Sequence, residues 1–193
     1  MRNQHFVFSG VIRRTVLILA LLLLTGASAA QANLITNGGF EDGYAGWTVQ
    51  TIPANLSTGA NSGQLAAELS QNGSVGTLSQ SFNTILGESY VLTFFLYNTG
   101  SSPTNLFQAD INNTAIITLQ DLPYQLYTEY NVLFTATSAL TTLVLNEQNN
   151  YPGNFLLDDV SVNPVPEPAT MLLLGSGIAG LMGFRMRRKT SVA

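Results

Sequence analysis

The sequence predicts an all-β fold, an antiparallel sandwich, over residues 33–163 of the 193-residue chain. Short apolar or alternating runs recur in this segment and are separated by Gly, Asn, Ser and Pro, a pattern typical of strands joined by turns. The segment contains neither heptads nor a long apolar period of 3.6 residues, so no helix is predicted in it. Its length of about 130 residues suits a single domain.

The strongest predicted strand is Tyr90–Tyr97, because its sequence YVLTFFLY is rich in aromatic and β-branched residues. We expect it at the centre of the sandwich, since it is apolar on both faces. The other predicted strands, in chain order, are Gln64–Leu69, Val75–Phe82, Leu106–Ile111, Ala115–Leu119, Thr128–Ala136, Leu140–Leu145 and Phe155–Val162. We expect the strands on either side of Asn112-Asn113 to pair through that turn, and the next two strands to form another pair.

The charges of this segment are of one sign. Between Thr15 and Phe184 the chain has no Lys, Arg or His, and it has no Cys anywhere. This composition excludes Ser–His–Asp or Cys–His catalysis, Schiff-base chemistry and a His/Cys zinc site in the domain. It also excludes a nucleic-acid-binding groove, which requires Lys or Arg.

Ten carboxylates give residues 33–163 a formal charge of −10, with no positive side chain to offset it. Carboxylates brought together without Lys or Arg require either protonation or a metal ion. We therefore expect a hard, oxygen-preferring cation, calcium first. The alternative is that the acidity only keeps an exported protein soluble.

The N-terminus has the three parts of a signal peptide over residues 1–32. Arg2, Arg13 and Arg14 form its basic region, and residues 16–24 form its Leu-rich apolar region. Ala30-Gln31-Ala32 matches the small-x-small cleavage pattern, so we predict cleavage between Ala32 and Asn33.

The C-terminus is also tripartite. Residues 164–170 form a Pro-rich linker that contains Val165, Pro166, Glu167 and Pro168, and its prolines are expected to end the sheet. The apolar run 171–184 is predicted to be a transmembrane helix, and the basic residues of the tail 185–193 are expected to stay on the cytoplasmic side.

This C-terminal pattern resembles the PEP-CTERM sorting signal of Gram-negative bacteria. The resemblance implies that the precursor is held in the inner membrane and processed near the Pro-Glu-Pro motif by an exosortase, a membrane transpeptidase. It also implies release to the cell surface or outside the cell, in association with exopolysaccharide and biofilm. A permanent membrane anchor is the alternative.

The domain itself resembles the galactose-binding-like jelly-roll modules, which include several carbohydrate-binding families. The residues that carry the resemblance are Asn33–Gly43 followed by Gly46-Trp47, a central hairpin over Phe82–Tyr97, and the last strand Phe155–Val162. The resemblance implies a jelly-roll sandwich whose first and last strands lie side by side, with a structural calcium near them. Carried over, it places Glu41 close to Asp158 or Asp159, and these three residues are the predicted calcium ligands. Strand alternation with Val160 and Val162 predicts that Asp158 points inward and Asp159 outward, and a bulge in this strand would reverse the two.

Sugar binding would use aromatic faces beside amides or carboxylates. The predicted ligand-contacting cluster is Tyr124, Tyr127 and Tyr130. Other candidates are Tyr97, Phe107 and Tyr151, with the amides of Gln108, Asn146, Gln148 and Asn149. Trp47, Tyr90 and Phe94 are expected to pack in the core.

Together these resemblances imply a non-catalytic, exported surface or extracellular-matrix protein that binds glycan. One alternative is a purely structural adhesin. Another is a carbohydrate-active enzyme, because glycoside hydrolysis is the hydrolytic chemistry that needs carboxylates alone.

Overall fold

The computed structural model describes residues 33–51, 55–69, 75–100, 104–149 and 153–166, together with Gly177. The predicted signal peptide 1–32 and the tail 185–193 lie outside these residues, as does the predicted transmembrane helix 171–184 apart from Gly177. Within the described part of the chain, no helix has the length and apolar character needed to cross a membrane.

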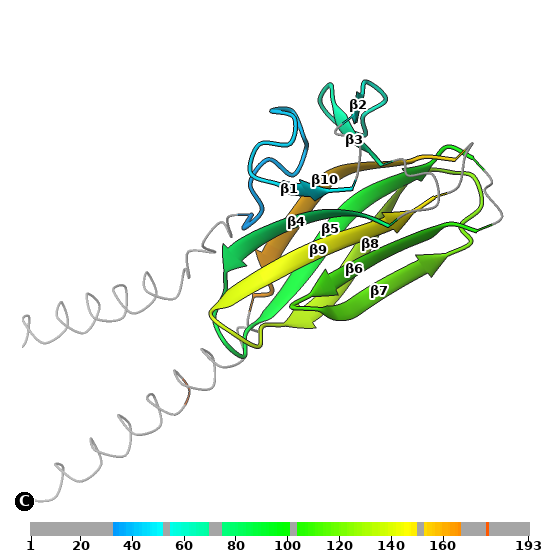
Figure 1. Ribbon diagram of the computed structural model, residues 1–193. Coiled ribbons are helices and arrows are strands. Elements are labelled where there is room, and N and C mark those ends of the chain that lie inside the picture. Colours follow the sequence, from blue (N-terminus) through cyan, green and yellow to red (C-terminus); the bar gives the residue numbers. More distant parts are fainter. Residues whose placement is uncertain are drawn as a thin grey trace, which may run out of the picture. The chain divides into compact units, whose positions relative to one another are not determined.

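The described residues form two five-stranded antiparallel sheets (Figure 1). The strand order of the first sheet is β1 (Thr48–Gln50), β4 (Gly76–Asn83), β9 (Leu140–Gln148), β6 (Leu106–Ile111) and β7 (Thr114–Gln120). The order of the second is β2 (Asn55–Ser57), β3 (Ala66–Leu69), β10 (Phe155–Pro164), β5 (Ser89–Asn98) and β8 (Gln125–Thr135). The predicted all-β antiparallel architecture is confirmed.

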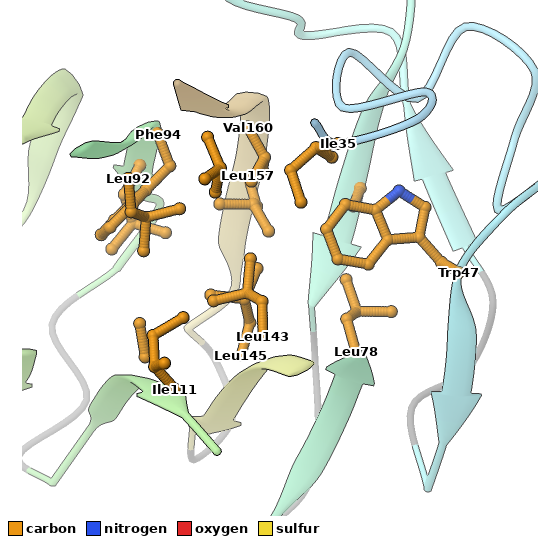
Figure 2. Packing of buried hydrophobic residues seen from close by; sticks show 14 of the residues in the cluster. Ile35, Trp47, Leu78, Leu92, Phe94, Ile111, Leu143, Leu145, Leu157 and Val160 are labelled. Carbon is orange, nitrogen blue, oxygen red and sulfur yellow. The ribbon is translucent and has the colours of Figure 1, made fainter. Parts of the chain in front are cut away.

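The hydrophobic core lies between the two sheets and consists of alternate residues from the facing strands (Figure 2). Leu92 and Phe94 enter it from β5, and Leu143 and Leu145 enter it from β9, each at most 1% exposed. At one side Trp47 is 8% exposed and stacks on Phe40, with ring centroids 5.5 Å apart. The prediction that Trp47, Tyr90 and Phe94 are core residues is confirmed.

Two predicted features of the strands are confirmed. The strand predicted at Tyr90–Tyr97 is β5, which lies between β10 and β8 in the second sheet. The strands around Asn112-Asn113 are β6 and β7, which pair directly. Asn112 and Asn113 have φ values of 48° and 66°, as a tight left-handed hairpin turn requires.

Two predicted pairings are wrong. Strands β8 and β9 belong to different sheets, and so do β4 and β5, which correspond to the expected central hairpin. Their connections cross from one sheet to the other and bond to each other, through Thr84 N–H to the Ala139 carbonyl at 3.0 Å and Gly87 N–H to the Ala136 carbonyl at 2.8 Å. Alternation in a strand shows that one face is buried, but it does not distinguish a partner beside the strand from one across the core. The short strands β1 and β2 were not predicted.

The second sheet extends further towards the C-terminus than predicted. Strand β10 continues through Pro164, which lies opposite Tyr90, and the Val165 N–H donates to the Ser89 carbonyl at 2.8 Å. The linker therefore does not begin at residue 164. Proline is accommodated at Pro164 because it is the terminal residue of the strand, where a missing N–H interrupts little of the ladder. Of the predicted sorting motif, Glu167 and Pro168 lie outside the described residues.

The first described segment runs beside β10, as the resemblance implied. Leu34 N–H donates to the Val162 carbonyl, and Val160 N–H donates to the Gly38 carbonyl, both at 2.9 Å. A Cβ atom on Gly38 would lie 1.8 Å from the Val160 carbonyl oxygen, so only glycine permits this approach. Asn33, the predicted mature N-terminus, accepts a 2.9 Å bond from Val162 N–H on its side-chain oxygen.

Candidate functional site

The loop between β2 and β3 (residues 58–65, the β2–β3 loop) is held by carboxylates that come from distant parts of the chain. Glu41 Oε1 accepts hydrogen bonds from the N–H groups of Gln64 at 2.8 Å and Leu65 at 3.0 Å. A Cβ atom on Gly63 would lie 2.2 Å from the same oxygen, so the loop passes close over this carboxylate. Glu41 thus fixes the second half of the loop.

Asp158 and Asp159 fix its first half. Asp158 Oδ2 accepts from Asn61 N–H at 2.7 Å and from Ser62 N–H at 3.1 Å. Asp159 accepts from the Asn61 side-chain amide at 2.8 Å and from the Ser62 hydroxyl at 2.7 Å. The loop therefore supplies hydrogen-bond donors to adjacent negative charges in a region that has no positive side chain.

A β-bulge places Asp158 on the outer face of the second sheet. The register of β10 against β5 shifts between Asp158 and Ser161, and Asp159 has a φ of 50°. Leu157 and Val160 both enter the core although they are three positions apart. The prediction that Asp158 shares the inward face of Val160 is therefore wrong, because the extra residue reverses the alternation.

Asp158 is nevertheless fully buried, beneath the β2–β3 loop. Burial raises the pKa of its carboxyl group, and N–H bonds from Ser62, Asp159 and Asn61 oppose that rise. Backbone N–H groups thus provide the hydrogen bonds that water would give to an exposed carboxylate.

A calcium site at Glu41, Asp158 and Asp159 would need their oxygens to face a common ion. Among the described residues, no group of three or more His, Cys, Asp or Glu side chains is arranged to hold a metal ion. Glu41, Asp158 and Asp159 each contact N–H or O–H donors of the loop. The three carboxylates therefore hold the β2–β3 loop in place through hydrogen bonds, an arrangement we call the loop clamp. That these residues bind calcium stays a prediction.

On the outer face of the second sheet, Tyr97, Tyr124 and Tyr127 form an aromatic group, the tyrosine cluster. The ring of Tyr97 lies edge-on to Tyr124 at a centroid distance of 5.9 Å and tilted to Tyr127 at 5.5 Å. The Tyr97 hydroxyl donates to the Tyr124 hydroxyl at 3.3 Å. Tyr124 is 57% exposed, so an aromatic ring in this cluster is open to a ligand.

Tyr127 joins the cluster to the β2–β3 loop. Its hydroxyl donates a 2.7 Å hydrogen bond to the Gly59 carbonyl. The pKa of the Tyr127 phenol is raised by burial and, further, by the charges of Asp158 and Asp159. The phenol therefore stays protonated and acts as a hydrogen-bond donor.

The other predicted aromatic residues lie elsewhere. Tyr130 is on the inner face of β8, where its ring stacks on Phe94 at 5.2 Å with an interplanar angle of 15°. Phe107 is fully buried in the core, and Tyr151 is outside the described residues. Of the predicted cluster, the structure brings Tyr124 and Tyr127 together with Tyr97 and separates Tyr130 from them.

The predicted amides are on a different sheet from the tyrosine cluster. Gln108 in β6 donates to Asp110 Oδ1 at 2.7 Å, and Asn146 in β9 donates to Asp110 Oδ2 at 2.8 Å. Gln148 also belongs to β9, and Asn149 is fully buried at the end of that strand. Both β6 and β9 belong to the first sheet, so these amides do not complete a site with the tyrosines.

Glu68 and Asn154 form a polar pair that the sequence did not suggest. Glu68 lies on the same line across the second sheet as Tyr97. Glu68 in β3 is opposite Leu156 in β10, which is itself opposite Tyr97 in β5. The Asn154 side-chain amide donates to Glu68 Oε1 at 2.7 Å. Only the register of three strands, distant in sequence, brings this carboxylate and amide to the face of the tyrosine cluster.

A second unpredicted feature is inside the sandwich. Both side-chain oxygens of Glu147, and both polar side-chain atoms of Asn149, are buried without a hydrogen-bond partner. Burial raises the pKa of Glu147 to about 8. The alternation of buried residues from Thr141 through Leu143 and Leu145 continues to Glu147, which is the signal that would have placed this carboxylate inward.

Comparison with known proteins identifies the C-terminal segment of the chain. Residues 164–189 match the PEP-CTERM protein-sorting motif. No curated protein matches the chain by sequence.

Similar solved structures cover the domain. The CBM22-1 xylan-binding domain from Paenibacillus barcinonensis Xyn10C has 15% identity and a TM-score of 0.57, covering 74% of this chain and 100% of its own. TmCBM61, solved with β-1,4-galactotriose, has 12% identity and a TM-score of 0.53, covering 69% and 99%. The K3 adhesin domain of Lys-gingipain from Porphyromonas gingivalis has 13% identity and a TM-score of 0.53, covering 69% and 98%. At these identities the likeness concerns the fold, which is that of jelly-roll carbohydrate-binding modules.

Proposed function

We propose that this chain, which carries a PEP-CTERM protein-sorting motif at residues 164–189, is an exported surface protein whose sandwich domain binds glycan without catalysis. In this proposal an exosortase processes a membrane-anchored precursor, and the released domain acts in an extracellular polysaccharide matrix or biofilm. The motif supports the processing step, and the geometry of the second sheet supports the binding step.

The observation that carries glycan binding is the tyrosine cluster. A pyranose ring has an apolar face of C–H groups that packs on an aromatic ring, while its hydroxyls need hydrogen-bond partners. Tyr124 offers a ring that is 57% exposed, and its contact with Tyr97 fixes the ring orientation. Leu126, two residues after Tyr124 and 66% exposed in β8, adds apolar surface.

Glu68 and Asn154 provide the polar part of the proposed site. Glu68 is separated from Tyr97 by one strand, β10, which corresponds to a distance of about 10 Å across the sheet. A short oligosaccharide can span that distance. Its hydroxyls would then bond to a carboxylate and an amide already oriented by their mutual 2.7 Å hydrogen bond.

The structural neighbours suggest which glycans to try first. One of them is a xylan-binding domain, and another was solved in complex with β-1,4-galactotriose. The absence of Lys, Arg and His between residues 15 and 184 also favours a neutral ligand. The charged side chains of the domain are all negative, so they would repel an acidic polysaccharide.

The test is electrophoresis of the full-length protein, purified in mild detergent, through native gels that contain xylan, β-1,4-galactan or exopolysaccharide from the host. We expect retardation in at least one of these gels. Substitution Tyr124→Ala should weaken the affinity about fivefold, the equivalent of about 1 kcal/mol for one aromatic contact.

The matched control is Leu133→Ala, which removes a side chain that is 71% exposed on β8, the strand that follows Tyr124. It should leave the retardation unchanged. If the wild-type protein migrates freely in all three gels, or if both variants lose retardation equally, the tyrosine cluster is not a glycan site.

An adhesin is the second candidate, because the K3 adhesin domain of Lys-gingipain shares the fold. It would attach cells through protein contacts. Cell attachment that persists in a protein without polysaccharide retardation would favour this function over glycan binding.

A further inference from the structure

The carboxyl end of β9 buries a carboxylate that has no partner. Glu147 is 0% exposed, and neither of its side-chain oxygens has a hydrogen-bond partner. Its register partners are Gly76 in β4 and Phe107 in β6, the two strands that flank β9 in the first sheet (Figure 1). The Phe107 ring contacts Phe155 of the opposite sheet at 5.9 Å, which makes the surroundings of Glu147 apolar.

Asn149 shares this position. It is two residues beyond Glu147, and the buried alternation of β9 places both side chains on the inner face. Its side-chain oxygen and nitrogen are also buried without a hydrogen-bond partner. A Cβ atom on Gly153 would lie 2.7 Å from Asn149 Oδ1, so a glycine is needed for the chain to pass this close to the amide.

Such groups are costly in an interior unless something compensates them. A buried carboxylate requires a counter-charge, and a buried amide requires hydrogen bonds or a metal ion. Arg, Lys or His normally provides the counter-charge, but the chain has none of these between residues 15 and 184. The compensating charge must therefore come from outside the chain, as a proton or as a bound cation.

A proton would satisfy only part of the site. It neutralises Glu147 and gives it one O–H donor, but no hydrogen bond joins this carboxyl group to the Asn149 amide. A hard cation interacts with both groups, because carboxylate and side-chain amide oxygens are the usual ligands of calcium. We propose that Glu147 and Asn149 form an internal calcium-binding site at the carboxyl end of β9, separate from Glu41, Asp158 and Asp159 and independent of glycan binding.

The test is calorimetric titration of calcium into the full-length protein in mild detergent, after treatment with a chelator and its removal. We expect a binding event in the wild-type protein that Glu147→Gln abolishes, since glutamine keeps the shape and removes the charge. Asn149→Asp should bind calcium at least as tightly as the wild type, because it adds a second negative ligand. A variant that only failed to fold would not retain or gain affinity.

Two controls make the assignment specific. Glu129→Gln removes the same charge from an exposed position on β8 and should leave the affinity unchanged. Glu41→Gln alters the loop clamp and should also leave this event intact. If the wild-type protein binds no calcium at millimolar concentrations, or if Glu147→Gln binds calcium as tightly as the wild type does, the proposal is wrong. In the first case Glu147 holds a proton.

Discussion

Tyr127 donates a 2.7 Å hydrogen bond to the carbonyl of Gly59, and this contact joins the tyrosine cluster to the β2–β3 loop. The same loop donates hydrogen bonds to the carboxylates of Asp158 and Asp159. One segment thus donates hydrogen bonds to a pair of adjacent acidic residues and positions one ring of the proposed glycan site. Stability of the loop and binding at the cluster should therefore be coupled.

Substitution Tyr127→Phe tests the contact itself. It removes one hydroxyl and the hydrogen bond that this hydroxyl donates to the Gly59 carbonyl, so we expect a loss of about 1 kcal/mol in the free energy of unfolding. Urea denaturation measures this loss, and proteolysis within residues 58–65 should become faster. Tyr124→Phe is the control, because its hydroxyl contacts only Tyr97 in an exposed setting, at 3.3 Å. Equal effects of the two substitutions would contradict the role assigned to Tyr127.

Asp158→Asn should destabilise the domain more strongly. Asp158 accepts bonds from three backbone N–H groups, those of Asn61, Ser62 and Asp159. An asparagine can offer a single oxygen and brings its own N–H donors to the same place, so we expect a loss of about 3 kcal/mol. Asp42→Asn, at an exposed carboxylate, should change stability by less than about 0.5 kcal/mol. A comparably small change for Asp158→Asn would mean that the loop is not held by this residue.

Calcium binding by Glu41, Asp158 and Asp159 can be tested separately from the site at Glu147. In a Glu147→Gln background, the melting temperature is compared in chelator and in calcium. If these three residues bind the ion, calcium at 100 times its dissociation constant stabilises the domain by about 2.7 kcal/mol and raises the melting temperature. An unchanged melting temperature would leave the three carboxylates as a clamp on the loop only.

Processing of the chain is tested by the intact mass of the protein from its native host, measured separately for membranes and medium. We expect a chain that begins at Asn33 and ends near Pro168. Recovery only in membranes, with the segment Arg185–Ala193 retained, would show that the tail is a permanent anchor and that an exosortase does not act on it.

The linear sequence was sufficient for the features that are local or compositional. The all-β class followed from short alternating runs, and the β6–β7 turn followed from two adjacent asparagines that accept positive φ values. The sorting motif is contiguous and was read directly. The exclusion of Lys-, His- and Cys-based chemistry also required only the composition.

The tertiary structure alone decided which residues meet. A single-residue bulge after Asp158 reversed the side-chain alternation of β10, and a bulge leaves no reliable mark in a sequence. The separation of Tyr130 from Tyr127, the placement of Glu68 on the same face as Tyr97 and the isolation of Glu147 all depend on strand register. Register is set by pairing between segments far apart in the chain, so the sequence determined the kinds of side chain available and the fold determined their neighbours.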